Sequence, residues 1–230
     1  WCSCCKEVTM KVELNKTYWR SITLNSQVNL TDQSALDASA AEGRGMQGME
    51  YTVKEILSIT EKDKLCEWLI FKLVHPKQTL YLVVKIVDDN IDLRVFYNPE
   101  SIIVGDRNDQ LNAQNYFMFA NYNPKGKNNL LGLKYTQQIA WTFDYGNGPQ
   151  EVIFNQKGNM ELTGTASYQP RRFAGETLVA TISEYLAASD TAEPEIMIIE
   201  VGNAKSKTGG AILLLVGNSI NEFEMSIVRK

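Results

Sequence analysis

Apolar and polar residues alternate along three neighbouring stretches in the first half of the chain. The stretches are residues 68–74, 80–87 and 91–97, and short turns at residues 75–78 and 88–90 separate them. Successive side chains of a strand point to opposite faces, and Pro, Asp and Asn supply the backbone angles that turns need. The pattern therefore predicts a three-stranded antiparallel meander.

The same pattern occurs again further along the chain. Residues 141–145, 152–154 and 160–165 alternate in the same way, with Gly and Asn in the turns between them. A tryptophan opens each group, Trp68 in the first and Trp141 in the second. The second group predicts another three-stranded meander, and the two are consistent with an internal duplication or with one continuous sheet system.

Further strands are predicted on either side of these meanders. The runs lie at residues 8–14, 18–30, 51–59, 195–201, 211–216 and 222–228. The first two would form an N-terminal hairpin, and a turn at residues 61–64 joins the third to the first meander. In the last run Phe223, Met225 and Ile227 alternate with polar residues, which predicts one face in the core and one in water.

Two segments carry helical signals. Residues 176–188 have apolar side chains at helical spacing, from Leu178 to Leu186, and this predicts a helix. Residues 31–41 are rich in Ala behind two good helix caps, so they form a short helix or belong to a loop that extends to residue 48.

Together these elements predict a mainly β protein, with antiparallel meanders forming a sandwich or a partly closed barrel and one or two short helices. The length fits a single β-rich domain over residues 1–230, or alternatively subdomains 1–105 and 130–230 joined by a polar loop at residues 105–129. The expected core residues are Trp68, Ile70, Leu82, Val84, Trp141, Phe143, Phe154, Leu213 and Leu215.

Composition is typical of a soluble globular protein and argues against two classes of partner. The net charge is −4, and the densest basic patch is limited to Lys125, Lys127 and Lys134, so no nucleic acid is expected as a partner. No stretch approaches the roughly 20 apolar residues of a membrane span, so none is predicted.

The four cysteines are unevenly placed, with Cys2, Cys4 and Cys5 close together and Cys66 far away. Such spacing does not suit a disulfide framework. This poor fit favours a reducing compartment and a cytoplasmic location. Cys2 and Cys5 have the spacing of a zinc knuckle, but only Cys66 and His75 remain to complete a four-ligand site. We therefore interpret the cluster as a thiol-rich terminus that folding does not need, while metal binding stays open and no cofactor is predicted.

No other motif identifies a catalytic centre. His75 is the only His and precedes Pro76 in a turn, on a strand end adjacent to that of Cys66, which makes a histidine-based triad improbable. Residues 202–210 resemble a phosphate-binding loop, but Ser206 stands where the motif needs Gly and an apolar strand follows. A hairpin loop is the better interpretation.

Oxygen-rich and aromatic clusters leave further options. Two acidic clusters lack the calcium-loop pattern: Asp88, Asp89, Asn90 and Asp92, and then Asp106, Asn108 and Asp109. Glu67, Asp144 and Glu151 are possible members of a hydrolytic carboxylate pair. The aromatic residues that gather in one region, as core or as an exposed platform, are Tyr116, Phe117, Phe119, Tyr122, Tyr135, Trp141, Phe143 and Tyr145.

These observations favour a non-enzymatic binding or scaffolding module for an unknown protein or small ligand, because the usual nucleophile, base and metal sets are missing. The alternative is a carboxylate-based hydrolase acting on carbohydrate, which needs neither His nor Cys. Two buried or cleft carboxylates roughly 5 to 10 Å apart beside an aromatic side chain would favour the hydrolase.

Overall fold

The fold was analysed in a computed structural model. It describes residues 15–30, 50–98, 102–104, 109–111, 121–122, 133–134, 138–144, 148–157, 162–171, 177–188, 195–203, 211–220 and 225–228. In these segments the secondary structure consists of one short helix and a series of strands. Their bounds are α1 (Lys16–Arg20), β1 (Gln27–Leu30), β2 (Glu50–Glu61), β3 (Cys66–His75), β4 (Gln78–Val87), β5 (Asn90–Tyr97), β6 (Ile102–Val104), β7 (Asp109–Leu111), β8 (Asn121–Tyr122), β9 (Leu133–Lys134), β10 (Gln138–Asp144), β11 (Pro149–Gln156), β12 (Leu162–Gln169), β13 (Leu178–Ala187), β14 (Glu195–Asn203), β15 (Ala211–Ser219) and β16 (Met225–Val228).

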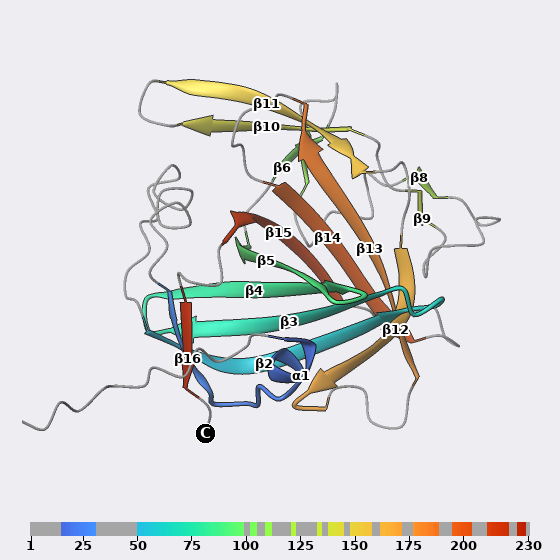
Figure 1. The fold of residues 1–230 in the computed structure, drawn as a ribbon. Helices are drawn as coiled ribbons and strands as arrows, with labels where there is room; N and C mark the ends of the chain where they lie inside the picture. The colour runs from blue at the N-terminus through green and yellow to red at the C-terminus, as the bar shows by residue number, and fades with distance from the viewer. Residues whose placement is uncertain are drawn as a thin grey trace, which may run out of the picture.

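Eight of these strands close into an antiparallel barrel (Figure 1). Strands β2 to β5 form one meander and strands β12 to β15 form another, each with neighbours in chain order. The meanders meet at two seams, where β12 pairs with β2 and β15 pairs with β5. The prediction of a mainly β fold with antiparallel meanders is confirmed, and the closed barrel is its specific form.

The interior of the barrel is a packed apolar core. One set of buried side chains includes residues from all eight barrel strands and from no other element, so it lies inside the barrel. Its members are Leu57, Ile59, Cys66, Trp68, Ile70, Tyr81, Val83, Phe96, Tyr168, Leu178, Ala180, Ile182, Met197, Ile199, Val201 and Leu215. Eight-stranded barrels are narrow enough for side chains to fill them, and these bulky residues do so.

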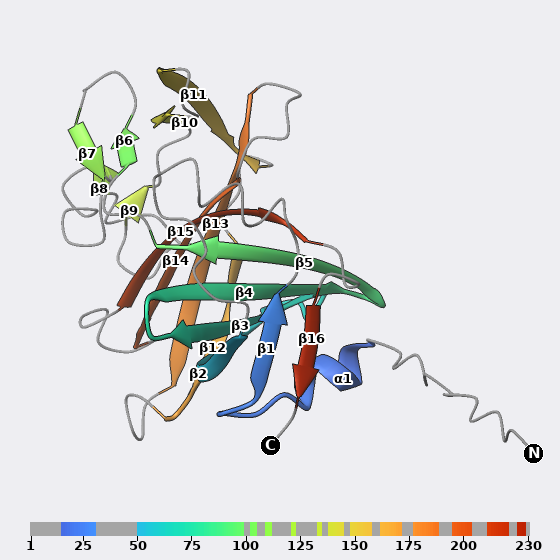
Figure 2. The same ribbon diagram turned by 90° about the vertical axis from the view of Figure 1, so that its left-hand side faces the viewer.

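A second core lies between the outer face of the barrel and a covering layer. Strands β1 and β16 pair with each other, and β1 pairs with the first residues of β2. The β2–β3 pairing shifts between Val53 and Glu55, and such a bulge bends a strand. In Figure 2, β1 and β16 cross in front of β3 and β4, with α1 beside them. Trp19 of α1 and Val28 of β1 are buried in this core.

Glycines let the two meanders approach closely at both seams. Gly164 of β12 faces β2, and a Cβ added there would overlap the carbonyl oxygen of Thr60. Gly217 of β15 faces β5, and a Cβ there would overlap the carbonyl oxygen of Val95. Glycine often marks a tight barrel corner of this kind, so both seams depend on the missing side chain.

The remaining described strands extend the structure beyond the barrel. The β10–β11 hairpin joins the end of β13 through β11 and projects at the top of Figure 1. Two short ribbons, β6–β7 and β8–β9, form separate two-stranded sheets.

The predicted helix at residues 176–188 is wrong, because residues 178–187 form strand β13. Its two faces are both buried, one in the interior core and the other in the second core, to which Tyr185 belongs. A strand that is apolar on both sides contains apolar pairs at helical spacing by chance, and for this reason the spacing predicted a helix. β-Branched residues such as Val179 and Ile182 favour the strand that is observed.

The second meander and the N-terminal hairpin are each partly wrong. Strands β10 and β11 pair as predicted, but β12 pairs with β13 and β2 instead of β11. Within residues 18–30 the structure has the end of α1 and only the short strand β1, because Asn15 caps the helix by accepting a hydrogen bond from the Tyr18 N–H at 3.1 Å. The predictions for residues 8–14 and 31–48 lie outside the described residues.

The other strand predictions are confirmed. The first meander, the strand at residues 51–59 and the three closing strands match β3–β5, β2 and β14–β16. The turn at residues 61–64 is closed by a hydrogen bond from Lys64 N to Glu61 O at 2.9 Å. Of the expected core, Trp68, Ile70, Leu82, Val84, Phe154 and Leu215 are buried and Leu213 is partly buried. The side chains of Trp141 and Phe143 are outside the description.

Candidate functional site: a rim pocket and a buried charged cluster

One mouth of the barrel carries both a pocket and a cluster of charged side chains. Cys66, which begins β3, pairs with Val87, which ends β4. The β2–β3 and β4–β5 turns therefore lie side by side on the same rim. Two further strands reach the same rim, because Glu184 lies near the end of β13 and Glu195 begins β14.

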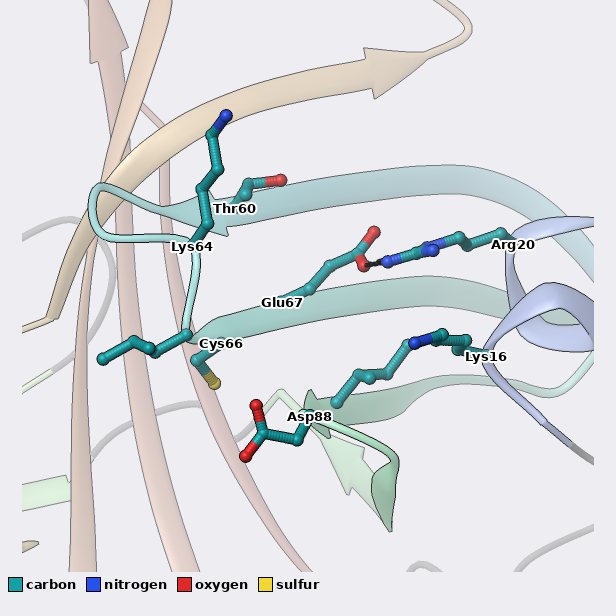
Figure 3. A pocket seen from close by; sticks show the side chains of 9 residues that line it. Lys16, Arg20, Thr60, Lys64, Cys66, Glu67 and Asp88 are labelled. Carbon is teal, nitrogen blue, oxygen red and sulfur yellow. Dashed lines mark hydrogen bonds and ion pairs between the residues drawn. The ribbon is translucent and has the colours of Figure 1, made fainter.

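The pocket lies between helix α1 and these two turns and has a volume of about 410 Å³ (Figure 3). Its lining residues come from α1, β2, β3, β4 and the two turns. They are Lys16, Arg20, Thr60, Lys64, Leu65, Cys66, Glu67, Ile86 and Asp88. This volume is within the usual range for small-molecule sites, and polar side chains of both charges surround it.

Two ion pairs fasten α1 to the rim of the barrel. Arg20 donates from Nη2 and Nε to Glu67 Oε2 at 2.5 and 3.0 Å, and this interaction raises the pKa of Arg20. Lys16 Nζ donates to Asp89 Oδ1 at 2.9 Å, which lowers the pKa of that carboxyl. These pairs neutralise two of the three cations that line the pocket.

Lys64 and Asp88 are the two charged lining residues that remain unpaired within the described part of the chain. Both are exposed turn residues. Lys64 has φ 61° and Asp88 has φ 55°, in the left-handed region where Gly and Asn are usual. A left-handed conformation costs of order 1 kcal/mol for a residue with a Cβ, so the rim places side chains where glycine would be the easier choice.

Cys66 lines the pocket, with the residue only 7% exposed. Burial raises the pKa of its thiol to about 11, with the carboxylates of Glu184 and Glu61 adding to this and Lys85 opposing it. The thiol is therefore neutral at physiological pH and is a poor nucleophile.

Behind the pocket, a charged cluster lies on the inward face of the strands, and we define it as Lys85, Asp92, Arg94, Glu184 and Glu195. Lys85 Nζ lies 2.7 and 3.0 Å from the two carboxylate oxygens of Glu184. Arg94 donates to Asp92 Oδ2 at 2.6 Å, and its Nη1 is 3.5 Å from Glu184 Oε1 and also contacts Glu195 Oε2.

Each charge of the cluster has an oppositely charged partner, as buried ions require, although the three carboxylates outnumber the two cations. Burial opposes the charge of Arg94, but the carboxylates of Glu195, Asp92 and Glu184 outweigh it and raise the pKa of the guanidinium. Burial also raises the pKa of Glu195, although Arg94 and Lys157 favour its ionised form. Lys85 Nζ is 5.5 Å from the centre of the Trp68 ring, so an aromatic side chain borders the cluster.

Several residues proposed from the sequence are placed apart from this mouth. Cys66 and His75 begin and end the same ten-residue strand, so the expectation that they lie on adjacent strand ends is wrong, and the two do not meet. His75 instead has an edge contact with Tyr51 and accepts a hydrogen bond from Lys77 N at 3.3 Å. The segment at residues 202–210 connects two paired strands, as a hairpin loop should.

The acidic residues proposed from the sequence differ in their contacts and exposure. Asp89 and Asp92 each pair with a cation, and Glu67 binds Arg20. Glu151 is exposed on β11. In the segments that the structure covers, no three His, Cys, Asp or Glu side chains are placed to hold a metal ion.

Other candidates cannot be placed. Cys2, Cys4, Cys5, Asp106, Asn108, Lys125, Lys127, Tyr116, Phe117, Phe119, Tyr135 and Tyr145 lie outside the described residues. Asp109, Tyr122, Lys134 and Asp144 lie on described strands, but their side chains are not described.

Sequence reasoning missed the charged cluster, although a signal for it exists. Lys85 is in phase with the buried residues Tyr81 and Val83 of β4, and Glu184 is in phase with Ala180 and Ile182 of β13. A charged residue at an inward position of an alternating strand indicates a buried ion pair, but the partner strands are far apart in sequence.

Comparisons with known proteins give no family for this chain. No protein-family model, curated protein sequence or solved structure matches it. In the described part of the chain, no helix has the length and apolar character needed to cross a membrane.

Proposed function

We propose that this chain is a non-enzymatic binding module whose ligand site is the rim pocket between α1 and the β2–β3 and β4–β5 turns. The observation that carries the proposal is the pair of left-handed turn residues, Lys64 and Asp88, which line the pocket and are otherwise unpaired among the described residues. Strained backbone persists where the surrounding structure imposes it, and it clusters at ligand sites.

Two further features support binding in preference to catalysis. The only described thiol, Cys66, is buried with a raised pKa, and the only histidine lies at the far end of its strand. The pocket is held in shape by the Arg20–Glu67 and Lys16–Asp89 pairs, which join α1 to two parts of the rim. A site formed in advance binds with a smaller entropic cost.

The test is a thermal-shift screen of small polar compounds that covers amino acids, organic acids, sugars and nucleotides. Leu65 is 63% exposed and lines the pocket, so Leu65→Trp should fill the site, whereas Lys62→Trp on the same turn should leave it open. We expect compounds that stabilise the wild type and Lys62→Trp but have no effect on Leu65→Trp. Failure of every compound, or equal stabilisation of Leu65→Trp, would refute the pocket as the binding site.

A carboxylate-based hydrolase acting on carbohydrate is the second candidate, and the charged cluster is the observation that favours it. Glu184 and Glu195 both lie within 3.5 Å of the same Arg94 nitrogen, near Trp68. Glu195 has a raised pKa, as a general acid requires, whereas Lys85 binds both oxygens of Glu184. Neither carboxylate lines the rim pocket, which is why binding is preferred.

Chromogenic glycosides test the hydrolase directly. Turnover that is lost in both Glu184→Gln and Glu195→Gln but kept in the exposed control Glu151→Gln would replace the binding module with the hydrolase. Absence of turnover across α- and β-linked substrates, with the wild type folded, would remove this candidate.

A further inference from the structure

The charges that line the rim pocket specify a class of ligand, and this inference rests on the proposed function. Of the charged lining residues, Arg20 and Lys16 are bound to carboxylates and Glu67 is bound to Arg20. Among the described residues, the lining charges without a partner are one cation, Lys64, and one anion, Asp88. We propose that the pocket binds a small zwitterion of the amino-acid type, with a carboxylate that Lys64 recognises and an ammonium group that Asp88 recognises.

The arrangement of the two turns supports recognition of both charges by one ligand. Cys66 pairs with Val87, and Lys64 lies two positions before this pair while Asp88 lies one position after it. The two side chains thus belong to adjacent connections on one rim. In Figure 3 the Lys64 side chain lies above Cys66 and the Asp88 carboxylate lies below it. In this view the Lys64 ammonium group points away from Cys66 and Asp88, so a ligand that contacts both charges requires the flexible Lys64 side chain to turn toward the pocket.

The other lining residues suit the remainder of such a ligand. Leu65 and Ile86 supply apolar surface, and the thiol of Cys66 is neutral, so it repels neither end of a zwitterion. Thr60 offers a hydroxyl that both donates and accepts. A simple anion would be attracted by Lys64 and repelled by Asp88, whereas a simple cation would meet the reverse; only a ligand that carries both charges satisfies the two residues together.

The experiment measures binding of each of the twenty standard amino acids by isothermal titration calorimetry, followed by two derivatives of the tightest binder. The amide removes the carboxylate charge, and the N-acetyl form removes the ammonium charge. We expect each derivative to bind the wild type about tenfold more weakly than the parent amino acid, as loss of one charge-assisted hydrogen bond implies.

Two variants connect each charge of the ligand with its residue. Asp88→Asn and Lys64→Asn keep a residue that tolerates the left-handed conformation, so both should fold. Asp88→Asn should weaken binding of the parent amino acid about tenfold and leave binding of the N-acetyl form unchanged. Lys64→Asn should weaken binding of the parent by a similar factor and leave binding of the amide unchanged. Asp63→Asn and Lys62→Asn change exposed charges on the β2–β3 turn outside the pocket, and they should bind as the wild type does.

The outcomes separate this inference from the proposed function. If no amino acid binds, or if both derivatives bind as tightly as the parent, the assignment of a zwitterionic ligand is wrong. The compound screen with Leu65→Trp then still decides whether the pocket binds another ligand. If Asp63→Asn and Lys62→Asn weaken binding as much as the pocket variants, the effect is one of net charge and the assigned contacts are wrong.

Discussion

Lys85 is the nearest cation to the buried carboxylate of Glu184, so its replacement by Met tests whether that carboxylate depends on its paired cation. The side chains of Lys85 and Glu184 are only 13% and 6% exposed. Met keeps most of the unbranched apolar stem, but it removes the ammonium group that binds both oxygens of Glu184 and lies over the Trp68 ring. The change therefore leaves a buried charge with weaker compensation.

The expected loss of stability follows from the remaining contacts. Removing one partner of a buried ion pair costs about 3–5 kcal/mol. Arg94 Nη1 and Lys157 Nζ stay 3.5 and 4.0 Å from Glu184, so we expect the lower end of that range. A loss of about 3 kcal/mol lowers the thermal midpoint of a chain of this size by about 6–12 °C.

A matched control exists on the inward face of β2 and β3, near the opposite mouth of the barrel. Lys72 pairs with Glu55 at 3.1 Å, but these side chains are 31% and 22% exposed. Because solvent screens such a pair, Lys72→Met should lower the free energy of unfolding by about 1 kcal/mol or less. Urea denaturation and calorimetry of both variants measure the difference.

Adding Glu184→Gln to Lys85→Met removes the uncompensated charge and should restore part of the lost stability. The argument would be refuted if Lys85→Met and Lys72→Met had equal effects, or if Glu184→Gln made the Lys85→Met protein still less stable. Either result would mean that water reaches the cluster and that the barrel mouth is open to solvent.

Three other predictions concern the seams, the pH dependence and the thiol. Gly164→Ala and Gly217→Ala should each lower the free energy of unfolding by about 2 kcal/mol or more, because the added Cβ overlaps a backbone carbonyl, whereas Ser219→Ala should change it by less than about 0.5 kcal/mol in urea titrations. The raised pKa of Glu195 means that the folded protein holds this proton more tightly than the unfolded chain, so this stabilisation is present at low pH and is lost as pH rises through the folded pKa. Because the glutamine side chain does not ionise, Glu195→Gln should gain stability relative to the wild type as the pH rises from about 4.5, the ordinary pKa of a glutamic acid, through the raised pKa of Glu195, and a constant difference in midpoint would contradict this. With a pKa of about 11 and 7% exposure, Cys66 should react with iodoacetamide at pH 8 at least about tenfold more slowly in the folded protein than in urea, and equal rates by peptide mapping would show that the thiol is accessible.

Local alternation in the sequence was sufficient to predict strands with one partner nearby in the chain. The β3–β4–β5 meander was located correctly because its turns carry Pro, Asp and Asn and its strands follow one another. Local alternation was insufficient to predict β13, where Leu178 and Ile182 face the interior and Tyr185 faces the outer core. Burial of both faces removes the period of two on which the prediction depends.

Pairing between distant strands also limited what could be predicted of the site. The second meander failed at β12, whose partners include β2, about one hundred residues away in sequence, and no local signal encodes that choice. The charged cluster joins Lys85 to Glu184 in the same way. Cys66, Glu67 and Asp88 were noted from their residue types, but their convergence with α1 on one pocket depends on the closure of the barrel.

The two seams also determine the order in which the protein can mature during synthesis. Strands β2 to β5 are complete when the ribosome has made residue 97, but β2 and β5 have no seam partners until β12 and β15 have been made. For that interval the nascent chain presents two open edges and one uncovered apolar face, which are the features that promote aggregation. Closure of a barrel from such distant partners is also slow, because the entropy cost of bringing the partners together precedes the contacts that offset it. Production of this protein should therefore depend on chaperones and on the rate of translation more than its final stability suggests.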